Sequence, residues 1–266
     1  MKYVKQNEKT IAYSSEGKGN VVVLVHGFCE DSFIWDEFKL DLIEKKYRVV
    51  CIDLPGFGAS EVVENLTIDG MADAVKAVVD HLNLTDFIII GHSMGGYTGL
   101  AFARKFPEYL KGLGIFHSHP YADSEEKKKN RYKGINFILE QGHHLFVKQL
   151  IPKLFAPDFA RSNRFLLDKL IHKASQYDPE GIIQGQKAMA ERPDQSAVLQ
   201  TISVPVLFII GEKDGAVTME QSMDQTSLPE VTSVHVLEKV GHMGMFESKR
   251  NTQLMVRQFA DFCYDQ

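Results

Sequence analysis

Apolar residues in this chain gather in short, nearly continuous runs and seldom alternate with polar residues. Four runs are clear, at residues 21–25, 47–52, 87–90 and 206–210, and a weaker one lies at 113–116. Their side chains are largely β-branched, which is typical of strands that are buried on both faces. The pattern therefore predicts a parallel sheet with helices on either side of it.

Between these runs, the spacing of apolar residues changes to that of helices. Thr67 is placed to cap one such helix. Its apolar face would carry Met71, Val75, Val78, Val79 and Leu82. Residues 246–262 predict a closing helix and 232–237 a further strand, while 1–6 and 10–16 predict an antiparallel pair with a tight turn between them. Alternating strands and helices indicate a doubly wound α/β sheet.

One long segment, residues 119–197, breaks this alternation because it offers no good strand candidate. It is helical in character, with interruptions at Gly142, Pro152, Pro157 and Pro179. We therefore expect residues 1–118 and 198–266 to form the core. Residues 119–197 would be inserted after the sixth strand as a helical cap, or lid, over the carboxyl edge of the sheet.

The apolar side of the predicted cap is expected to face the substrate. Phe137, Phe146 and Leu150 are the candidates to line a pocket there, with few fixed charges on the inner side. The basic run at residues 127–129 stands beside two glutamates, a pattern that is typical of a solvated helix face.

Composition narrows the classes of protein and partner. The chain has 266 residues, 44% of them hydrophobic, and a net charge of −5, which argues against a nucleic-acid partner. The apolar runs are too short to span a bilayer, and residues 1–19 lack the apolar region of a secretory signal. The three cysteines show no metal-ligand spacing. We expect a cytoplasmic monomer or homodimer with no membrane partner and no bound metal.

Ser93 stands between Gly91 and Gly95 directly after an apolar run, in the pattern G-x-S-x-G. A strand that ends there and a helix that begins there need a very sharp turn, and glycines on both sides avoid clashes of Cβ atoms. Such a turn exposes the serine hydroxyl at a helix N-terminus, the nucleophile elbow. The alternative role for Ser93 is that of a simple helix cap.

A serine hydroxyl needs a base, and the base needs an acid to orient it. His242 follows a late predicted strand and precedes the last helix, which is the place expected for the base. Asp214 lies in the loop after the strand before that one and is the expected acid. Glu212 is the second candidate, and Asp123, after an earlier strand, is the third.

The oxyanion of an acyl-transfer reaction needs two hydrogen-bond donors. One is the backbone N–H of Met94, the residue after the serine. The other is expected from the loop "VLVHGFCED", where the N–H of Phe28 is best placed. His26 in that loop is expected to have a structural role.

With these residues, the chain resembles the α/β-hydrolase superfamily over nearly all of its length. The motifs "HGF", "DLPGFGAS", "GHSMGG", "GEKDGAV" and "GHMGMFE" occur in the expected order. It is similar in detail to the carboxylesterase, haloperoxidase-like and carbon–carbon-bond hydrolase branches that have a cap. The resemblance implies a mostly parallel eight-stranded sheet, no cofactor, and these catalytic and oxyanion residues: Ser93 (nucleophile), Asp214 (acid), His242 (base), Phe28 and Met94 (N–H donors).

The expected activity is therefore hydrolysis of small, largely apolar carboxylic esters through an acyl-enzyme, with a small-molecule ester as partner. Perhydrolysis and cleavage of a carbon–carbon bond beside a ketone would use the same triad and stay open. Serine at the elbow excludes the branches with an aspartate nucleophile. No arginine clearly anchors an acidic substrate tail, and Arg192 in "ERPD" is expected to pair between cap and core. A ligand sensor is the non-enzymatic alternative.

Overall fold

A computed structural model describes residues 1–265 and shows one eight-stranded sheet with the strand order β1-β2-β4-β3-β5-β6-β7-β8. The strands are β1 (Lys2–Gln6), β2 (Lys9–Gly17), β3 (Val21–Val25), β4 (Arg48–Ile52), β5 (Phe87–His92), β6 (Leu110–Phe116), β7 (Val206–Gly211) and β8 (Thr232–Leu237). Strands β3 to β8 pair in parallel, and β1 and β2 add an antiparallel edge next to β4. The mostly parallel sheet predicted from the apolar runs is confirmed.

Every predicted strand is present, and the differences lie at the strand ends. β5 continues through Gly91 to His92, so it ends directly before Ser93. β6 begins at Leu110, three residues earlier than the apolar run suggested, because the exposed Lys111 and Gly112 interrupt the apolar pattern before residue 113. The hairpin between β1 and β2 turns at Asn7 and Glu8, both with positive φ.

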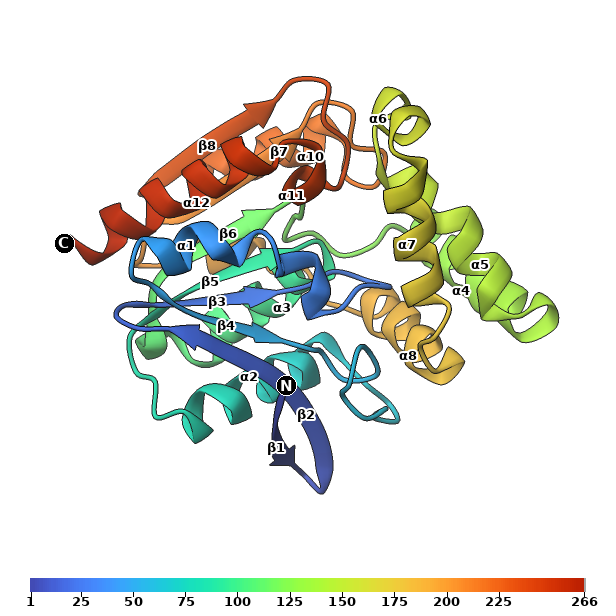
Figure 1. Cartoon of the computed structure of the whole chain (residues 1–266), viewed down its shortest axis with the longest axis horizontal. Coiled ribbons are helices and arrows are strands. Elements are labelled where there is room, and N and C mark those ends of the chain that lie inside the picture. The colour runs from blue at the N-terminus through green and yellow to red at the C-terminus, as the bar shows by residue number, and fades with distance from the viewer. Residues whose placement is uncertain (266) are drawn as a thin grey trace.

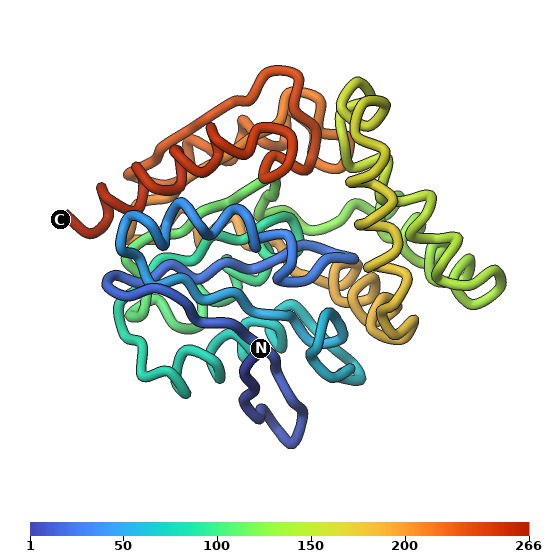
Figure 2. Tube along the Cα trace, viewed as in Figure 1, coloured from blue at the N-terminus to red at the C-terminus, as the bar shows by residue number. Residues whose placement is uncertain are grey.

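Helices cover both faces of the sheet, as Figure 1 shows. α1 (Lys39–Glu44) and α12 (Lys249–Tyr264) contact each other on one face, and Figure 2 shows them side by side. α2 (Ile68–His81) and α3 (Met94–Lys105) contact each other on the other face, where Thr67 caps α2 as predicted. The predicted closing helix is two helices, because the backbone breaks at Ser248 between α11 (Gly244–Glu247) and α12.

Shorter elements complete the core. α9 (Ser196–Thr201) contacts α3, and α10 (Met219–Asp224) contacts β7. Three 3-10 turns join core elements: η1 (Ser32–Trp35), η2 (Pro107–Tyr109) and η4 (Gln225–Ser227). In the part of the chain that the structure describes, no helix has both the length and the apolar character needed to cross a membrane.

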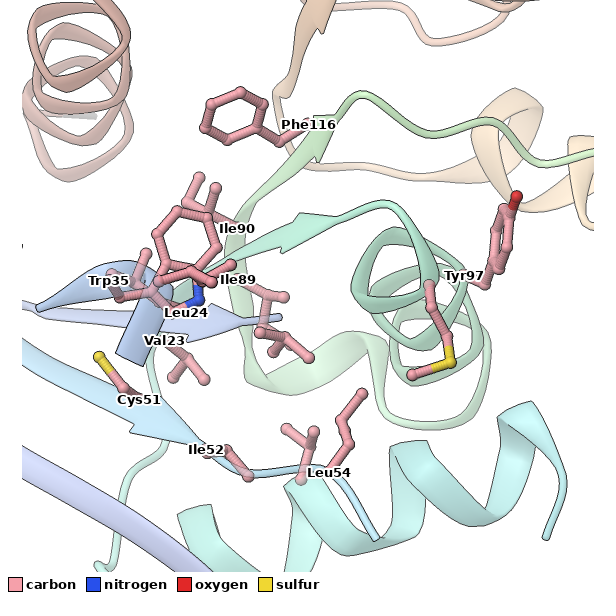
Figure 3. Close-up of a cluster of buried hydrophobic side chains, with 14 of the residues drawn as sticks. Val23, Leu24, Trp35, Cys51, Ile52, Leu54, Ile89, Ile90, Tyr97 and Phe116 are labelled. Carbon is pink, nitrogen blue, oxygen red and sulfur yellow. The ribbon is translucent and has the colours of Figure 1, made fainter. Parts of the chain in front are cut away.

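The hydrophobic core lies between the sheet and its helices, and Figure 3 shows part of it. Trp35 is fully buried, with its ring centroid 5.2 Å from that of Phe38 and 6.1 Å from that of Phe116. Burial of one large apolar side chain contributes about 1.5–3 kcal/mol to the free energy of unfolding. Phe116 is the last residue of β6, so this packing holds the carboxyl end of that strand near the candidate site.

Between β6 and β7 the chain forms a separate group of helices: α4 (Glu125–Gln141), α5 (His143–Leu150), η3 (Ile151–Leu154), α6 (Pro157–Ser162), α7 (Arg164–Ala174) and α8 (Pro179–Ala190). The breaks expected from glycine and proline are present, since Gly142 separates α4 from α5 and prolines begin α6 and α8. Figure 1 shows the group on the side toward which the arrows of β3 and β5 point. It therefore stands beyond the carboxyl ends of these parallel strands.

The motif "DLPGFGAS" forms a loop after β4 that is stabilised by hydrogen bonds of its two polar side chains. The Asp53 carboxylate accepts hydrogen bonds from the amides of Ser32 (2.8 Å) and Ala59 (2.9 Å). The Ser60 hydroxyl donates to the Asp53 carbonyl at 2.6 Å and accepts from the Ala12 amide at 2.8 Å. Both polar side chains of the motif thus have structural partners.

Candidate active site

Ser93 occupies the sharp turn between β5 and α3. Its φ of 51° and ψ of −114° lie in a region that costs a non-glycine residue about 1–3 kcal/mol. A Cβ atom on Gly91 would lie 2.2 Å from the Gly95 carbonyl oxygen, and one on Gly95 would lie 2.4 Å from the Val25 carbonyl oxygen. Only glycine fits these two positions, so the G-x-S-x-G pattern lets strand and helix approach closely enough to form the turn.

The loop after β3 lies directly over this turn. A Cβ atom on Gly27 would come within 3.1 Å of the Ser93 Cβ, so the two backbones are in close contact. The next residue is Phe28, and Met94 is the first residue of α3. Within residues 1–265, neither of their amides has a hydrogen-bond partner. Both predicted donors thus lie next to Ser93 or to the loop over it, and their N–H groups have no partner among the described residues.

His242 and Asp214 come together from the loops after β8 and β7. His242 Nδ1 lies 2.8 Å from Asp214 Oδ2 and donates to it, which leaves Nε2 as the basic nitrogen. The other carboxylate oxygen accepts from the amides of Ala216 (2.8 Å) and Val217 (3.0 Å). Burial by itself would raise the pKa of Asp214, but the charge of His242 and its N–H, with the nearby His117, outweigh it and lower the pKa.

His117 is a second imidazole beside Asp214, and the sequence reasoning missed it. Its Nε2 accepts from the Gly244 amide at 3.2 Å, so the proton sits on Nδ1, 3.4 Å from Asp214 Oδ2. This contact is too long for a good hydrogen bond, and burial dominates: it lowers the pKa of His117 to about 4, despite the carboxylate. His117 is therefore a neutral imidazole that packs between the Asp214 carboxylate and the Gly244 amide.

Glu30 and His92 form a buried ion pair behind the serine, which the sequence did not predict. Glu30 accepts from the Gly27 amide at 2.6 Å and from His92 Nδ1 at 2.9 Å, while His92 Nε2 donates to the His242 carbonyl at 2.8 Å. Both ring nitrogens of His92 face acceptors, which requires the charged imidazolium. Burial opposes both charges, but their mutual attraction and hydrogen bonds raise the pKa of His92 and lower that of Glu30.

This pair ties three loops of the site to one another. Through Gly27 it holds the loop that carries Phe28, through His92 it holds the elbow, and through the His242 carbonyl it holds the base. His92 is therefore a structural histidine that joins these loops through its two ring nitrogens. Glu30 lies in "HGFCED", but nothing in the local pattern says that its carboxylate turns inward.

Glu247 fixes the loop of His242 from the other side. It accepts from the amides of Gly241 and Met243 at 3.1 Å and from that of Ala156 at 2.9 Å. Burial raises its pKa, against these hydrogen bonds. It is the last residue of α11 and lies two residues before α12 begins. Its role is that of a clamp on the loop.

The other acid candidates are occupied elsewhere. Glu212 is on the surface, where it accepts from the Lys239 amide at 2.9 Å. The buried Asp123 pairs with Arg131 and with Arg192, the latter at 2.7 Å. The prediction that Arg192 forms an ion pair between cap and core is thus wrong, because its acidic partner lies in the same inserted segment. What Arg192 places on the core is a cation–π contact, 3.9 Å from the centre of the Tyr97 ring.

Ser93 and His242 line one cleft of about 290 Å³ between the core and the inserted helices. Its apolar wall includes Phe28, Leu150, Leu154, Met189 and Val217. Leu150 was predicted to line the pocket. Phe137 is absent from this lining because it stands two helical turns, about 10 Å, beyond Asn130 on α4. Phe146 touches the edge of the Phe28 ring instead, with the centroids 6.3 Å apart.

Fixed charges also line the cleft. The prediction that the inner side of the inserted segment carries few charges is therefore wrong. Lys127 and Arg131 face it from α4, with Asn130 and Gln186 beside them. Residues three and four apart share one face of a helix, so Lys127, Asn130 and Arg131 point the same way. The basic run that was expected to be a solvated face therefore turns its first lysine toward the cleft.

Comparison with known proteins finds related sequences over most of the chain. Residues 20–249 match the family model described as "alpha/beta hydrolase fold". 3-oxoadipate enol-lactonase 2 of Acinetobacter baylyi is 30% identical over 187 residues, which cover 70% of this chain and 68% of that protein. 2-hydroxy-6-oxo-6-phenylhexa-2,4-dienoate hydrolase of Comamonas testosteroni is 26% identical over 270 residues, which cover 92% of this chain and 91% of that protein.

Among solved structures, a thermophilic esterase from Thermogutta terrifontis in its malate-bound form superposes with a TM-score of 0.92. It shares 28% sequence identity, and the match covers 98% of each chain.

Proposed function

Because this chain belongs to the alpha/beta hydrolase fold family, we propose that it is a serine hydrolase that cleaves carboxylic esters. The observation that carries the proposal is one cleft lined by a strained, partly exposed Ser93 and by His242, whose Nδ1 is hydrogen-bonded to Asp214. The relatives support a hydrolase, since their names include an enol-lactonase and an esterase. A lactone is a cyclic ester, so both names describe acyl transfer to water.

In the proposed mechanism, Ser93 Oγ attacks the ester carbonyl carbon while His242 Nε2 takes its proton. The carbonyl oxygen becomes an oxyanion that accepts hydrogen bonds from the amides of Phe28 and Met94. One such donor contributes about 2.7–4 kcal/mol to transition-state stabilisation. The C–O bond then breaks, the alcohol leaves with the proton from His242, and the acyl group stays on Ser93.

Water completes the cycle by the same steps in reverse order. His242 Nε2 takes a proton from water, the hydroxide adds to the acyl carbon, and collapse returns the proton to Ser93 as the acid departs. Asp214 keeps the proton of His242 on Nδ1 throughout and stabilises the imidazolium. Every bond made or broken involves only the substrate, water, Ser93 and His242, and we propose no cofactor.

We propose that residues 119–197 form the cap that closes the cleft and selects the ester. Leu150 and Leu154 contribute apolar surface from the cap, and Phe28 does so from the core. Contact with them stabilises the ground state and the transition state alike. Each added methylene group should therefore strengthen binding by up to about 0.8 kcal/mol, and so lower KM, until the cleft is full.

The test is the nucleophile. The Ser93→Ala variant should lose at least ~10³-fold of ester hydrolysis with an unchanged thermal unfolding curve, because the triad acts as a unit. A fluorophosphonate should label Ser93, as located by mass spectrometry, and repeated turnover of p-nitrophenyl butyrate should distinguish an enzyme from a ligand sensor. An adduct on another residue, together with an active Ser93→Ala variant, would disprove the proposal.

A further inference from the structure

Lys127 is a cation at the wall of the cleft that has no acidic partner. It follows the N-cap Ser124 of α4, and its side chain is partly buried. Its Nζ donates to the Ala216 carbonyl at 3.2 Å, in the loop that also carries Asp214. Within residues 1–265, no carboxylate lies within 4 Å of this ammonium. One of its three N–H donors is thus used, and the ammonium is held in place at the cleft.

The acids near the cleft are all taken by other groups. Asp214 accepts from His242 and from two backbone amides, and Glu30 accepts from His92 and Gly27. Asp123 lies between Arg131 and Arg192, so that cluster of one acid and two arginines carries a net charge of +1. Within residues 1–265, no acid lies within 4 Å of the Lys127 ammonium, and no acid other than Asp123 lies within 4 Å of the two arginines.

A neighbouring histidine adds no positive charge to this region. His119 lies next to the cluster, with its Nε2 3.4 Å from the Tyr97 hydroxyl. Burial, and then the charges of Arg192 and Lys127, lower the pKa of His119 to about 3. The imidazole therefore stays neutral and adds no charge of its own.

We propose that the ester taken by this site carries a carboxylate, which binds to Lys127 beside Asn130 and Arg131. This inference rests on the proposed function. A singly charged group fits better than a phosphate dianion, because the Nε and Nη2 atoms of Arg131 face Asp123 and Lys127 is the one cation of the lining without an acid. The apolar wall would hold the carbon chain between the ester and the carboxylate. The site would thus select acid-bearing esters rather than the uncharged esters that the sequence suggested.

The test uses matched pairs of esters in which a methyl ketone replaces the carboxylate at constant shape. Monomethyl glutarate is compared with methyl 5-oxohexanoate, and 4-acetoxybutanoate with 5-acetoxypentan-2-one, so that either side of the ester can carry the anion. In at least one pair, kcat/KM should be about tenfold or more higher for the acid, as expected for a charge-assisted hydrogen bond.

Lys127→Met should reduce this preference about tenfold, mainly through KM, since the contact forms equally in ground and transition states. Lys127→Arg should keep most of the preference. Lys129→Met is the matched control, because this exposed lysine of the same helix is not part of the cleft lining. Added salt should weaken the preference of the native protein through screening.

A binding measurement separates this inference from the proposed function. In the Ser93→Ala variant, calorimetry should show tighter binding of 4-acetamidobutanoate than of 5-acetamidopentan-2-one, and the difference should vanish with Lys127→Met. If both esters of each pair are hydrolysed equally and Lys127→Met changes nothing, the carboxylate site is wrong and the hydrolase stands. If no ester is hydrolysed, calorimetry alone decides, and equal binding overturns the inference.

Discussion

The two walls of the cleft treat their polar groups in opposite ways. At the core wall and directly behind it, Glu30, His92 and Asp214 have buried side chains, and each already has its partners within the chain. On the wall formed by α4, Lys127 has one carbonyl partner and its remaining N–H groups face the cleft or solvent. Groups that position the reacting atoms are satisfied before substrate arrives, whereas groups that would recognise the substrate are not.

The physical reason lies in the cost of burying charge. An isolated ion in the interior is so unfavourable that it must be paired or neutralised. On the core side, fixed hydrogen bonds within the chain offset this cost before any substrate binds. The geometry there does not depend on the ligand. A partly exposed ammonium is stabilised by water, and a substrate anion can replace that water without leaving a buried charge behind.

The largest expected effect is on the core wall at its acid. Asp214→Asn should lower kcat about 10⁴-fold, because an amide can donate to Nδ1 and so favours the wrong tautomer of His242. Steady-state kinetics with p-nitrophenyl butyrate measure this. Glu212→Gln is the matched control in the same loop and should change kcat little. If Asp123→Asn were the crippling substitution instead, the assignment of the acid would fail.

The next effect is on the buried pair. Glu30→Gln should lower the free energy of unfolding by about 3 kcal/mol, because it leaves the His92 charge buried without its counter-ion. Urea denaturation measures this loss. Glu37→Gln, which breaks a surface pair with Lys249, is the control and should cost less than about 1 kcal/mol. Equal losses in the two variants would mean that the Glu30–His92 pair contributes no more than a surface pair.

The same pair gives the core wall a pH dependence of known sign. The pKa of His92 is higher in the folded state than its ordinary value of about 6.5. The stabilisation that the charged His92 gives is therefore fully present below about pH 6.5, and it is lost as the pH rises through the folded-state pKa. Glu30 has a lowered pKa and stays ionised over this range. The stability gap between native protein and Glu30→Gln should therefore be widest near pH 6 and narrow toward pH 9. A gap that widens with pH would contradict the charged state of His92.

The smallest effect is expected on the apolar part of the cap wall. Leu150→Ala removes side-chain surface that would contact substrate, worth about 1 kcal/mol, and should raise KM about fivefold at constant kcat. Leu145→Ala is the control, because Leu145 lies on the same helix but is 45% exposed and absent from the lining. A kcat change larger than the KM change would show that Leu150 supports the triad rather than the substrate.

The sequence predicts the sheet well because its signals are local. Buried parallel strands appear as apolar runs, and the G-x-S-x-G turn needs glycine for reasons set by backbone contact alone. Asp214 and His242 are also local signals, since each follows a strand, and the sheet order then brings their loops together.

The remaining site residues depend on contacts between distant parts of the chain. Glu30 and His92 are 62 positions apart, and His117 reaches Gly244 over 127 positions. No periodicity in either segment points to the other. The inward turn of Lys127 depends on how α4 lies against the core, and a helix with charges on several sides does not reveal this in its sequence. For the same reason, three apolar cap residues could be named but only Leu150 lines the cleft.

The clamp around His242 has a consequence for the way this protein could be re-engineered. The His242 amide donates to the Leu154 carbonyl at 2.7 Å, and Glu247 binds the Ala156 amide. A Cβ atom on Gly241 would approach the Ala156 nitrogen to 2.5 Å, so the segment at 154–156 is seated on the base loop. A chimera that exchanges residues 119–197 for those of another hydrolase would transplant part of the base's own scaffold. Such an exchange should succeed where the donor backbone places a carbonyl and an N–H group where Leu154 and Ala156 place theirs. Graft boundaries chosen only from the ends of helices would separate His242 from these contacts.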